Sequence, residues 1–410
     1  MNERTKRRIK YYGAVHGQEE IDAVVEVLSG PPRKLLVGEN VERFEKRVAN
    51  AFGKRFGVMV NAGTSGLYVA IELLGLAPGD EIITTALTFS TDVAAMVRSR
   101  LVPVFIDVES DTFNADVNAI EAAIGPRTKA ILLPNLIGNA PDWDAVRAVA
   151  NRYDLICIED SCDAFAPILR GTPTSARADL TVTSFSMSHI ITCAGSGGMV
   201  LLDDPALRDR ALLLRRWGRS SEIEMFGSRK GMGDGRFFTE LDGMVYDSLF
   251  MFEDIGWNFE PSELGAAFGL QQLLRLDGFL AARQRIFDRL HRFFATRTEV
   301  IAPRQLDGLT TGWQCFPFII APDAPFTRAA LQRFMETNGI DTRMVWTGNI
   351  LRQPGFRSIE HRVAPSGLAN TDRVMDAGLI TPLNPALTDD DCDYIIATVA
   401  EFLQQAVPST

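Results

Sequence analysis

The 410-residue sequence lacks any run of 18 apolar residues, so it offers no segment that would cross a membrane as a helix. The first ten residues, MNERTKRRIK, are basic, but YYGAVHGQEE follows where a secretory signal needs an apolar core. We therefore expect no signal peptide and no membrane partner. Residues 1–20 are interpreted as an exposed N-terminal arm.

Cysteine is scarce, and the sequence has no CxxC pair. This spacing predicts reduced thiols and a cytoplasmic protein for the five cysteines, Cys157, Cys162, Cys193, Cys315 and Cys392. The formal net charge of −10 argues against nucleic acid as a partner. The length and the 46% hydrophobic content predict a large core, divided between two domains.

Short β-branched runs alternate with helix-like segments from about residue 55 to 205. The seven runs are FGVMVNAG, EIITTALTF, VPVFIDV, KAILLPNL, DLICIED, DLTVTSFS and GGMVLLDD. Because these runs are almost wholly apolar, they predict a mostly parallel sheet that is covered on both faces. The fold class is therefore α/β, with a large domain over residues 21–270.

A smaller C-terminal α/β domain is expected over residues 271–410. The segment from Leu264 to about Thr296 has the spacing of one long amphipathic helix that leads into it. A strand-like QCFPFII and a helical TRAALQRFMETNG follow, and a last helix begins at LTDDD with Thr388 as its N-cap. Residues 219–246 are rich in glycine and weakly periodic, which predicts a long surface loop.

Unusual residues follow three of the predicted strands, where α/β sheets bind ligands. The turn Gly63-Thr64-Ser65-Gly66 leads into a helix and could bind a phosphate, or merely connect two elements. Glu159 and Asp160 end a second strand, with Asp163 close behind, and could pair with a ligand cation, cap a helix or form an ion pair.

The third strand ends at Ser184 in the stretch SFSMSHIITCAGSGGMV. His189 lies in the loop that follows, as an acid/base group or as a structural histidine, and Phe89 ends a neighbouring strand where it could cover a planar ring. Together these features could bind a phosphate, pair with a protonated pyridine, stack on its ring and transfer a proton.

The chain resembles the sugar aminotransferase and dehydratase family of fold-type-I pyridoxal phosphate enzymes, which have an aspartate-aminotransferase-like fold. The resemblance lies in ordered segments over nearly the whole chain: LLVGENVERFEKRVA, NAGTSGL, PGDEIITTALTF, VPVFIDV, IEDSCDA, SF…H…GG and IGWNFEPSELGAAFGLQQL. It implies pyridoxal or pyridoxamine 5′-phosphate as cofactor and a homodimer with shared active sites.

The resemblance also implies the role of each matching residue. Thr64, Ser65 and Ser184 would bind the cofactor phosphate, and Phe89 would stack on the ring. Asp160 would pair with the ring nitrogen, and Asp163 would lie near the 3-hydroxyl. Asn258, in GWNFE, would reach the phosphate of the neighbouring subunit.

His189 stands where aminotransferases of the family have their Schiff-base lysine. None of the seven lysines (Lys6, Lys10, Lys34, Lys46, Lys54, Lys129 and Lys230) has a matching context. Imidazole makes no stable covalent link to the cofactor but can move a proton. This exchange marks the branch of sugar 3-dehydratases, which remove the C3 hydroxyl of nucleotide-linked 4-keto-6-deoxyhexoses.

One dehydratase subtype carries an iron–sulfur cluster, but here Ser220, Ser221 and Glu222 follow WGR where its cysteines would lie. We therefore expect no metal, and L-glutamate as the amino donor that regenerates pyridoxamine phosphate. A nucleotide-sugar diphosphate suits arginines, so Arg219, Arg343 and Arg352, with Asn349, are candidate substrate contacts. The alternatives are a nucleotide-sugar aminotransferase and a catalytically silent cofactor-binding paralogue.

Overall fold

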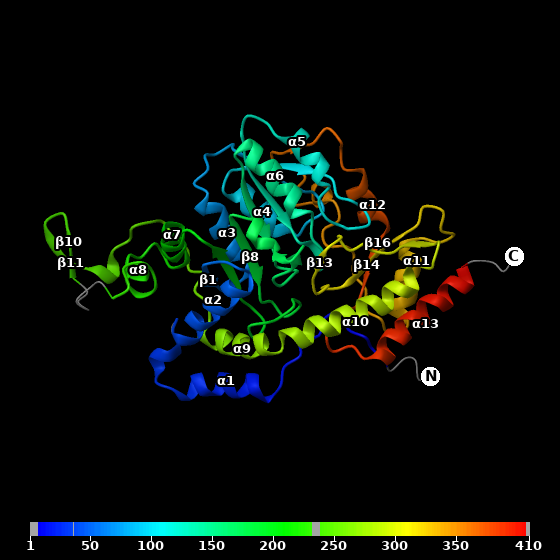
Figure 1. Ribbon diagram of the computed structural model, residues 1–410, viewed down its shortest axis with the longest axis horizontal. Helices are drawn as coiled ribbons and strands as arrows, with labels where there is room; N and C mark the ends of the chain where they lie inside the picture. Colours follow the sequence, from blue (N-terminus) through cyan, green and yellow to red (C-terminus); the bar gives the residue numbers. More distant parts are fainter. Residues whose placement is uncertain (1–6, 36, 232–237, 407–410) are drawn as a thin grey trace.

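The computed structural model describes residues 7–35, 37–231 and 238–406 (Figure 1). Its centre is an eight-stranded sheet of order β1-β9-β8-β5-β4-β2-β3-β15. Neighbouring strands pair in parallel except at β9, which is antiparallel to both β1 and β8. The strands are β1 (Phe56–Val60), β2 (Glu81–Thr85), β3 (Val102–Ile106), β4 (Thr128–Pro134), β5 (Ile156–Asp160), β8 (Leu180–Ser184), β9 (Gly198–Leu202) and β15 (Arg362–Val363).

Both faces of this sheet are buried, which confirms the predicted α/β fold. Along β4, Ala130 and Leu132 belong to one hydrophobic core, whereas Ile131 and Leu133 belong to another on the opposite face. This explains why the strands read as continuous apolar runs rather than alternating ones. The covering helices are α2 (Glu39–Ala51), α3 (Gly63–Leu73), α4 (Ser90–Arg98), α5 (Ile120–Ala123), α6 (Trp143–Tyr153) and α7 (Pro205–Arg215).

The C-terminal part has its own antiparallel sheet of order β12-β14-β16 and its own aromatic core. Its elements are β12 (Val300–Ile301), β14 (Phe316–Ile320), β16 (Gly378–Thr381), α10 (Leu276–Phe294), α11 (Arg328–Thr337), α12 (Ala369–Ala377) and α13 (Asp389–Ala406). The start of α13 is as predicted, because the Thr388 hydroxyl accepts a hydrogen bond from the Asp391 amide and the Asp391 carboxylate accepts one from the Thr388 amide. The boundary at residue 270 falls inside α9 (Glu263–Leu274) and stays a prediction.

Two expectations about local structure are wrong. The long helix from Leu264 is two helices, α9 and α10, which are separated by a turn at Arg275 (φ −98°, ψ −3°). The expected loop at residues 219–246 holds α8 (Ser221–Phe226) and a hairpin of β10 (Phe238–Leu241) and β11 (Met244–Asp247), while residues 232–237 of it lie outside the described residues. This hairpin projects from the body of the molecule (Figure 1).

The N-terminal segment runs along the C-terminal part with Ile9 buried, while Arg8, Lys10, Tyr12, Ala14 and His16 are exposed; Lys6 and the five residues before it lie outside the described residues. Ile9 is 3% exposed and pairs with Ile340 of the C-terminal part, and the Tyr11 amide donates to Asp341 Oδ2 at 3.2 Å. After this segment, α1 (Gln18–Ser29) packs on α9. The apolar side chains of this segment explain its docking.

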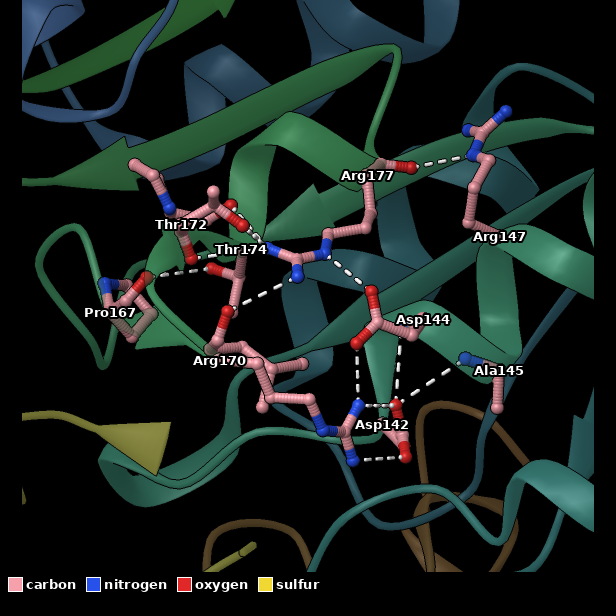
Figure 2. A network of polar contacts seen from close by, with 11 residues as sticks. Asp142, Asp144, Ala145, Arg147, Pro167, Arg170, Thr172, Thr174 and Arg177 are labelled. Atoms are coloured by element: carbon pink, nitrogen blue, oxygen red, sulfur yellow. Dashed lines mark hydrogen bonds and ion pairs between the residues drawn. The ribbon is translucent and has the colours of Figure 1, made fainter. Parts of the chain in front are cut away.

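A polar network joins the start of α6 to a small sheet of β13 (Leu309–Thr310), β6 (Ile168–Leu169) and β7 (Thr172–Pro173). Figure 2 shows the Arg170 guanidinium donating to both oxygens of Asp142, at 2.9 and 2.8 Å, while Arg177 Nε donates to Asp144 at 2.8 Å. Asp142 is also the N-cap of α6, accepting from the amides of Asp144 and Ala145.

β15 is supplied by the C-terminal part of the chain yet pairs in parallel with β3 of the large sheet. Arg362 of β15 donates to both oxygens of Glu81 on β2, at 2.8 and 2.7 Å. The two halves of the chain are thereby joined at the sheet edge. No helix in the described part of the chain is both long and apolar enough to span a bilayer.

Candidate active site

A cavity of about 890 Å³ opens at the carboxyl ends of the parallel strands. Its walls come from the ends of β1, β2, β5 and β8 and from the C-terminal part of the chain. The predicted site residues in the wall are Thr64, Phe89, Asp160, Asp163, Ser184, His189 and Arg343. The fold therefore brings together side chains that are far apart in sequence, as expected for this class of sheet.

The turn after β1 leaves backbone N–H groups free at the start of α3. The N-cap residue is Ala62, which has no side chain that could cap the helix. The turn lies tightly against β9, because a Cβ on Gly198 would come within 2.4 Å of the Ala62 backbone. A phosphate at this end of α3 would meet the N–H groups, the helix dipole and the hydroxyls of Thr64 and Ser184. Ser65 does not line the cavity: its hydroxyl donates to Asn61 Oδ1 at 2.6 Å.

The two acids that end β5 face opposite sides of the sheet. Glu159 is buried away from the cavity and accepts from Asn135 Nδ2 at 2.6 Å, from Thr181 Oγ1 at 2.9 Å and from the Thr174 hydroxyl. Asp160 lines the cavity and lies against a second buried carboxyl, Asp92, with which it shares a hydrogen bond. Burial raises the pKa of both, so a cationic partner at Asp160 would offset the cost of its charge.

Asp163 is held from two sides at the cavity wall. The Ile137 amide donates to its Oδ2 at 2.9 Å, and the indole of Trp346 donates to the same carboxyl. Burial nevertheless raises the pKa of Asp163 to about 8, so its carboxyl holds a proton at neutral pH. Phe89 lies across the cavity with its side chain 53% exposed, which leaves a ring face open to a planar ligand.

His189 is neutral at physiological pH. Burial lowers its pKa to about 4, assisted by the positive charge of Arg283 and opposed by the nearby backbone of Ser184. Its Nε2 lies 3.9 Å from Asp163 Oδ1, and its Nδ1 is buried without a hydrogen-bond partner. Within the described residues the cavity wall contains no lysine.

Several predicted contacts lie outside this cavity in the single chain. Asn349 and Arg352 both donate to Asp372, Arg352 at 2.8 and 2.6 Å. The Arg219 guanidinium lies 4.6 Å from the Trp217 ring centroid. Asn258 is exposed and bridges to the Arg216 backbone. Of the predicted substrate arginines, only Arg343 reaches the wall, where it covers the Tyr11 ring at 5.5 Å.

The wall also contains residues that the sequence did not predict, among them four from the N-terminal segment and the C-terminal part, Tyr11, Gln314, Trp346 and Phe356. None of them follows a strand of the large sheet, so the rule about strand ends does not find them. Trp346 has one local peculiarity, a left-handed backbone (φ 43°), which is uncommon for a bulky residue. That peculiarity is not visible in the sequence.

The sheet order, the reversed strand β9 and the polar groups at the strand ends define an enzyme with the pyridoxal phosphate fold type I. The model of the DegT/DnrJ/EryC1/StrS aminotransferase family matches residues 15–400, and the chain belongs to that family.

Two relatives and one solved structure show the extent of the similarity. The chain is 35% identical to dTDP-4-dehydro-2,6-dideoxy-D-glucose 3-dehydratase from Saccharopolyspora spinosa, over 97% of this chain and 87% of that protein. It is 32% identical to the lipopolysaccharide biosynthesis protein RfbH of Salmonella typhimurium, over 95% and 90%. The structure of E. coli GDP-4-keto-6-deoxy-D-mannose-3-dehydratase with bound hydrated PLP aligns with a TM-score of 0.86 at 25% identity, covering 96% of this chain and all of that one.

Proposed function

We propose that this enzyme removes the C3 hydroxyl of a nucleotide-linked 4-keto-6-deoxyhexose, with pyridoxamine 5′-phosphate as cofactor and without an iron–sulfur cluster. The observation that carries the proposal is the position of His189 in the cavity wall, beside Asp163, where no described residue offers a lysine. The 3-dehydratase relatives support the same reaction.

The residues of the wall fit the cofactor. Thr64, Ser184 and the uncapped start of α3 would hold its phosphate, Phe89 would cover its ring, and Asp160 would keep the ring nitrogen protonated. When bound, pyridoxamine phosphate supplies a primary amine for the C4 ketone and a ring that accepts electrons. Neutral His189 would accept the C4′ proton at Nε2 and return it to the leaving hydroxyl.

The loop after WGR supports a reaction without a cluster. Glu222 is fully buried and pairs with Arg215 and Arg216, at 3.1 and 3.0 Å. Ser220 donates to the Ser248 carbonyl at 3.3 Å. These side chains are committed to contacts within the protein, and hydroxyl groups and a paired carboxylate are poor ligands for iron–sulfur clusters.

We also propose a cytoplasmic homodimer in which each subunit completes its partner's site, with Arg219 and Asn258 facing the partner. Two observations support it. Asn258 is exposed and outside its own cavity, and two apolar side chains, Ile255 three residues before it and Val245 on the β10–β11 hairpin, are 92% and 81% exposed. Apolar exposure of this extent is typical of a protein interface.

The test of the activity is a product assay by mass spectrometry. Purified enzyme is incubated with a nucleotide-linked 4-keto-6-deoxyhexose, the cofactor and L-glutamate, and the expected product is the 3-deoxy-4-keto sugar. His189→Asn should abolish it while the absorbance of bound cofactor remains. A 4-amino sugar product, or a lysine adduct fixed by borohydride and seen in the intact mass, would assign the chain to the aminotransferases. Bound cofactor without turnover of the sugar would indicate the silent, cofactor-binding paralogue.

A further inference from the structure

Arg283 of α10 is a buried cation with only neutral partners. Its side chain is 2% exposed, and Nη1 donates to the carbonyl oxygens of Trp313, Gln314 and Leu383 at 2.9, 3.0 and 3.0 Å. Among the described residues no carboxylate pairs with it. Burial lowers the pKa of Arg283 to about 10, so it remains charged at neutral pH. An interior charge without a counter-ion is costly, which suggests a role beyond linking three carbonyls.

The same guanidinium lies behind His189. Its Nη2 donates to the His189 carbonyl at a long 3.5 Å. Both residues also line a small cavity of about 10 Å³, separate from the active-site cavity, together with Gln272, Thr192 and Pro385. That volume is about what one water molecule requires.

Two buried polar atoms of these residues have no hydrogen-bond partner in the protein, His189 Nδ1 and Arg283 Nε. An arginine N–H can only donate, whereas a water oxygen can accept two hydrogen bonds. One water in the small cavity could therefore accept from Arg283 Nε–H and from a proton on His189 Nδ1. The other ring nitrogen, Nε2, lies toward Asp163 in the active-site cavity.

We propose that Arg283, through one water in this small cavity and through the His189 carbonyl, holds His189 as the tautomer with its proton on Nδ1. This leaves the lone pair of Nε2 directed into the active-site cavity. The inference rests on the proposed function, in which Nε2 accepts a proton, since the other tautomer would carry a hydrogen on that atom. Arg283 touches neither substrate nor cofactor and acts as a positioning residue. The charged or titratable groups facing the ring are Asp163 and Arg283.

The tautomer can be read directly by ¹⁵N NMR of the cofactor-free protein labelled at histidine. The chain has only four histidines, and His189→Asn assigns the signal of His189. At pH 7 we expect Nδ1 protonated and Nε2 unprotonated in the unmodified protein. In Arg283→Met the ratio of the two tautomers should fall about tenfold, the effect of losing one hydrogen bond. The matched control is Arg285→Met, on the same helix, where the exposed arginine pairs with Asp389 and the ratio should not change.

A proton on Nε2 in the unmodified protein would overturn the inference, as would an unchanged ratio in folded Arg283→Met. If circular dichroism finds Arg283→Met unfolded, Arg283→Lys keeps the charge but removes the Nε–H donor, and the same fall is expected. The product assay keeps the two proposals apart. If the protein dehydrates its substrate but His189 carries its proton on Nε2, only the proposed tautomer is refuted. If His189 has the expected tautomer but no dehydration occurs, only the proposed function is refuted.

Discussion

Burial sets the chemistry of single side chains in this site. Imidazole in water is half protonated near pH 6.5, whereas burial brings the pKa of His189 to about 4. The charged form is disfavoured, so the ring remains able to accept a proton well below neutral pH.

We predict that the kcat/KM of dehydration stays nearly constant from pH 7 down to about 5 and falls only as the pH approaches 4. The reason is that His189 loses its role as proton acceptor only when it becomes charged. The measurement is a pH profile of initial rates on the 4-keto sugar. An acid limb centred near pH 6.5 would mean that His189 is solvated and contradict the geometry.

Asp163 shows the opposite shift, since burial raises its pKa to about 8. A carboxyl that binds its proton more tightly when folded stabilises the folded state fully below its unfolded pKa, near 3.9. That contribution declines as the pH rises and is lost above about 8. At high pH the folded protein has to carry a buried charge.

Asp163→Asn should therefore change how the stability of the cofactor-free protein depends on pH. Relative to the original protein, the variant should gain on the order of 1 kcal/mol or more between pH 5 and pH 8.5, because asparagine does not ionise. Urea unfolding at the two pH values measures the difference. Equal pH dependence in both proteins would show that Asp163 is not buried as a neutral acid.

At the scale of elements, the N-terminus of α6 depends on Asp142 in two ways. Its carboxylate caps the helix through the amides of Asp144 and Ala145, and it pairs with Arg170, which lowers the pKa of Asp142 (Figure 2). Asparagine caps a helix about as well as aspartate but carries no charge.

Asp142→Ala should cost about 1 kcal/mol more of unfolding free energy than Asp142→Asn, because only alanine removes the cap. The asparagine variant itself should lose less than about 1 kcal/mol, since the Arg170 pair is partly exposed to solvent. Thermal and urea denaturation of the three proteins tests the ranking. Equal losses would show that the cap contributes nothing.

Burial decided which elements of the fold could be predicted from the sequence. The strands were recognised because both faces of the sheet are covered, as the alternation of Ala130 and Ile131 between two cores shows. The break at Arg275 was missed because the apolar spacing continues through it. The hairpin β10–β11 was missed because its residues are exposed or half-buried, so no apolar strand pattern marks it.

The same reason separates the site residues that were found from those that were missed. Asp160 and Ser184 are the last residues of two parallel strands, so their common edge could be inferred from chain order. Tyr11 and Gln314 enter the cavity from the N-terminal segment and from the C-terminal part, by tertiary contacts that leave no periodic signal. Ser65 failed to line the cavity because its neighbour Asn61 accepts its hydroxyl.

At the scale of the whole molecule, the proposed dimer with shared sites makes a prediction about mixed subunits. His189→Asn damages a site from within, whereas Asn258→Ala would damage the site of the partner. Each homodimer should be nearly inactive. When the two variants are unfolded and refolded together, about half of the dimers should be heterodimers, and each heterodimer should contain one site with neither change. Activity should therefore return to roughly a quarter of the original, because one of the two sites is intact in half of the dimers.

A separate variant, Val245→Glu, tests whether the exposed hairpin lies in the dimer interface, because it adds a charge there. Light scattering should then find monomers in place of dimers, because burying an unpaired charge in an interface is costly. If the protein is dimeric but activity does not return on mixing, Asn258 acts in the active site of its own subunit or in no active site.

The edge strand β15 also bears on how the protein is made. The outer side of β3 is covered only once Arg362 and Val363 exist, some 250 residues after β3 itself. At a synthesis rate of about 5–20 residues per second, a nascent sheet waits roughly 10–50 s for its last strand. During that time an unpaired strand edge is open to other chains on the polysome. The yield of folded protein in a host cell should therefore increase with slower growth or with chaperones, although the edge of β3 is paired in the finished fold.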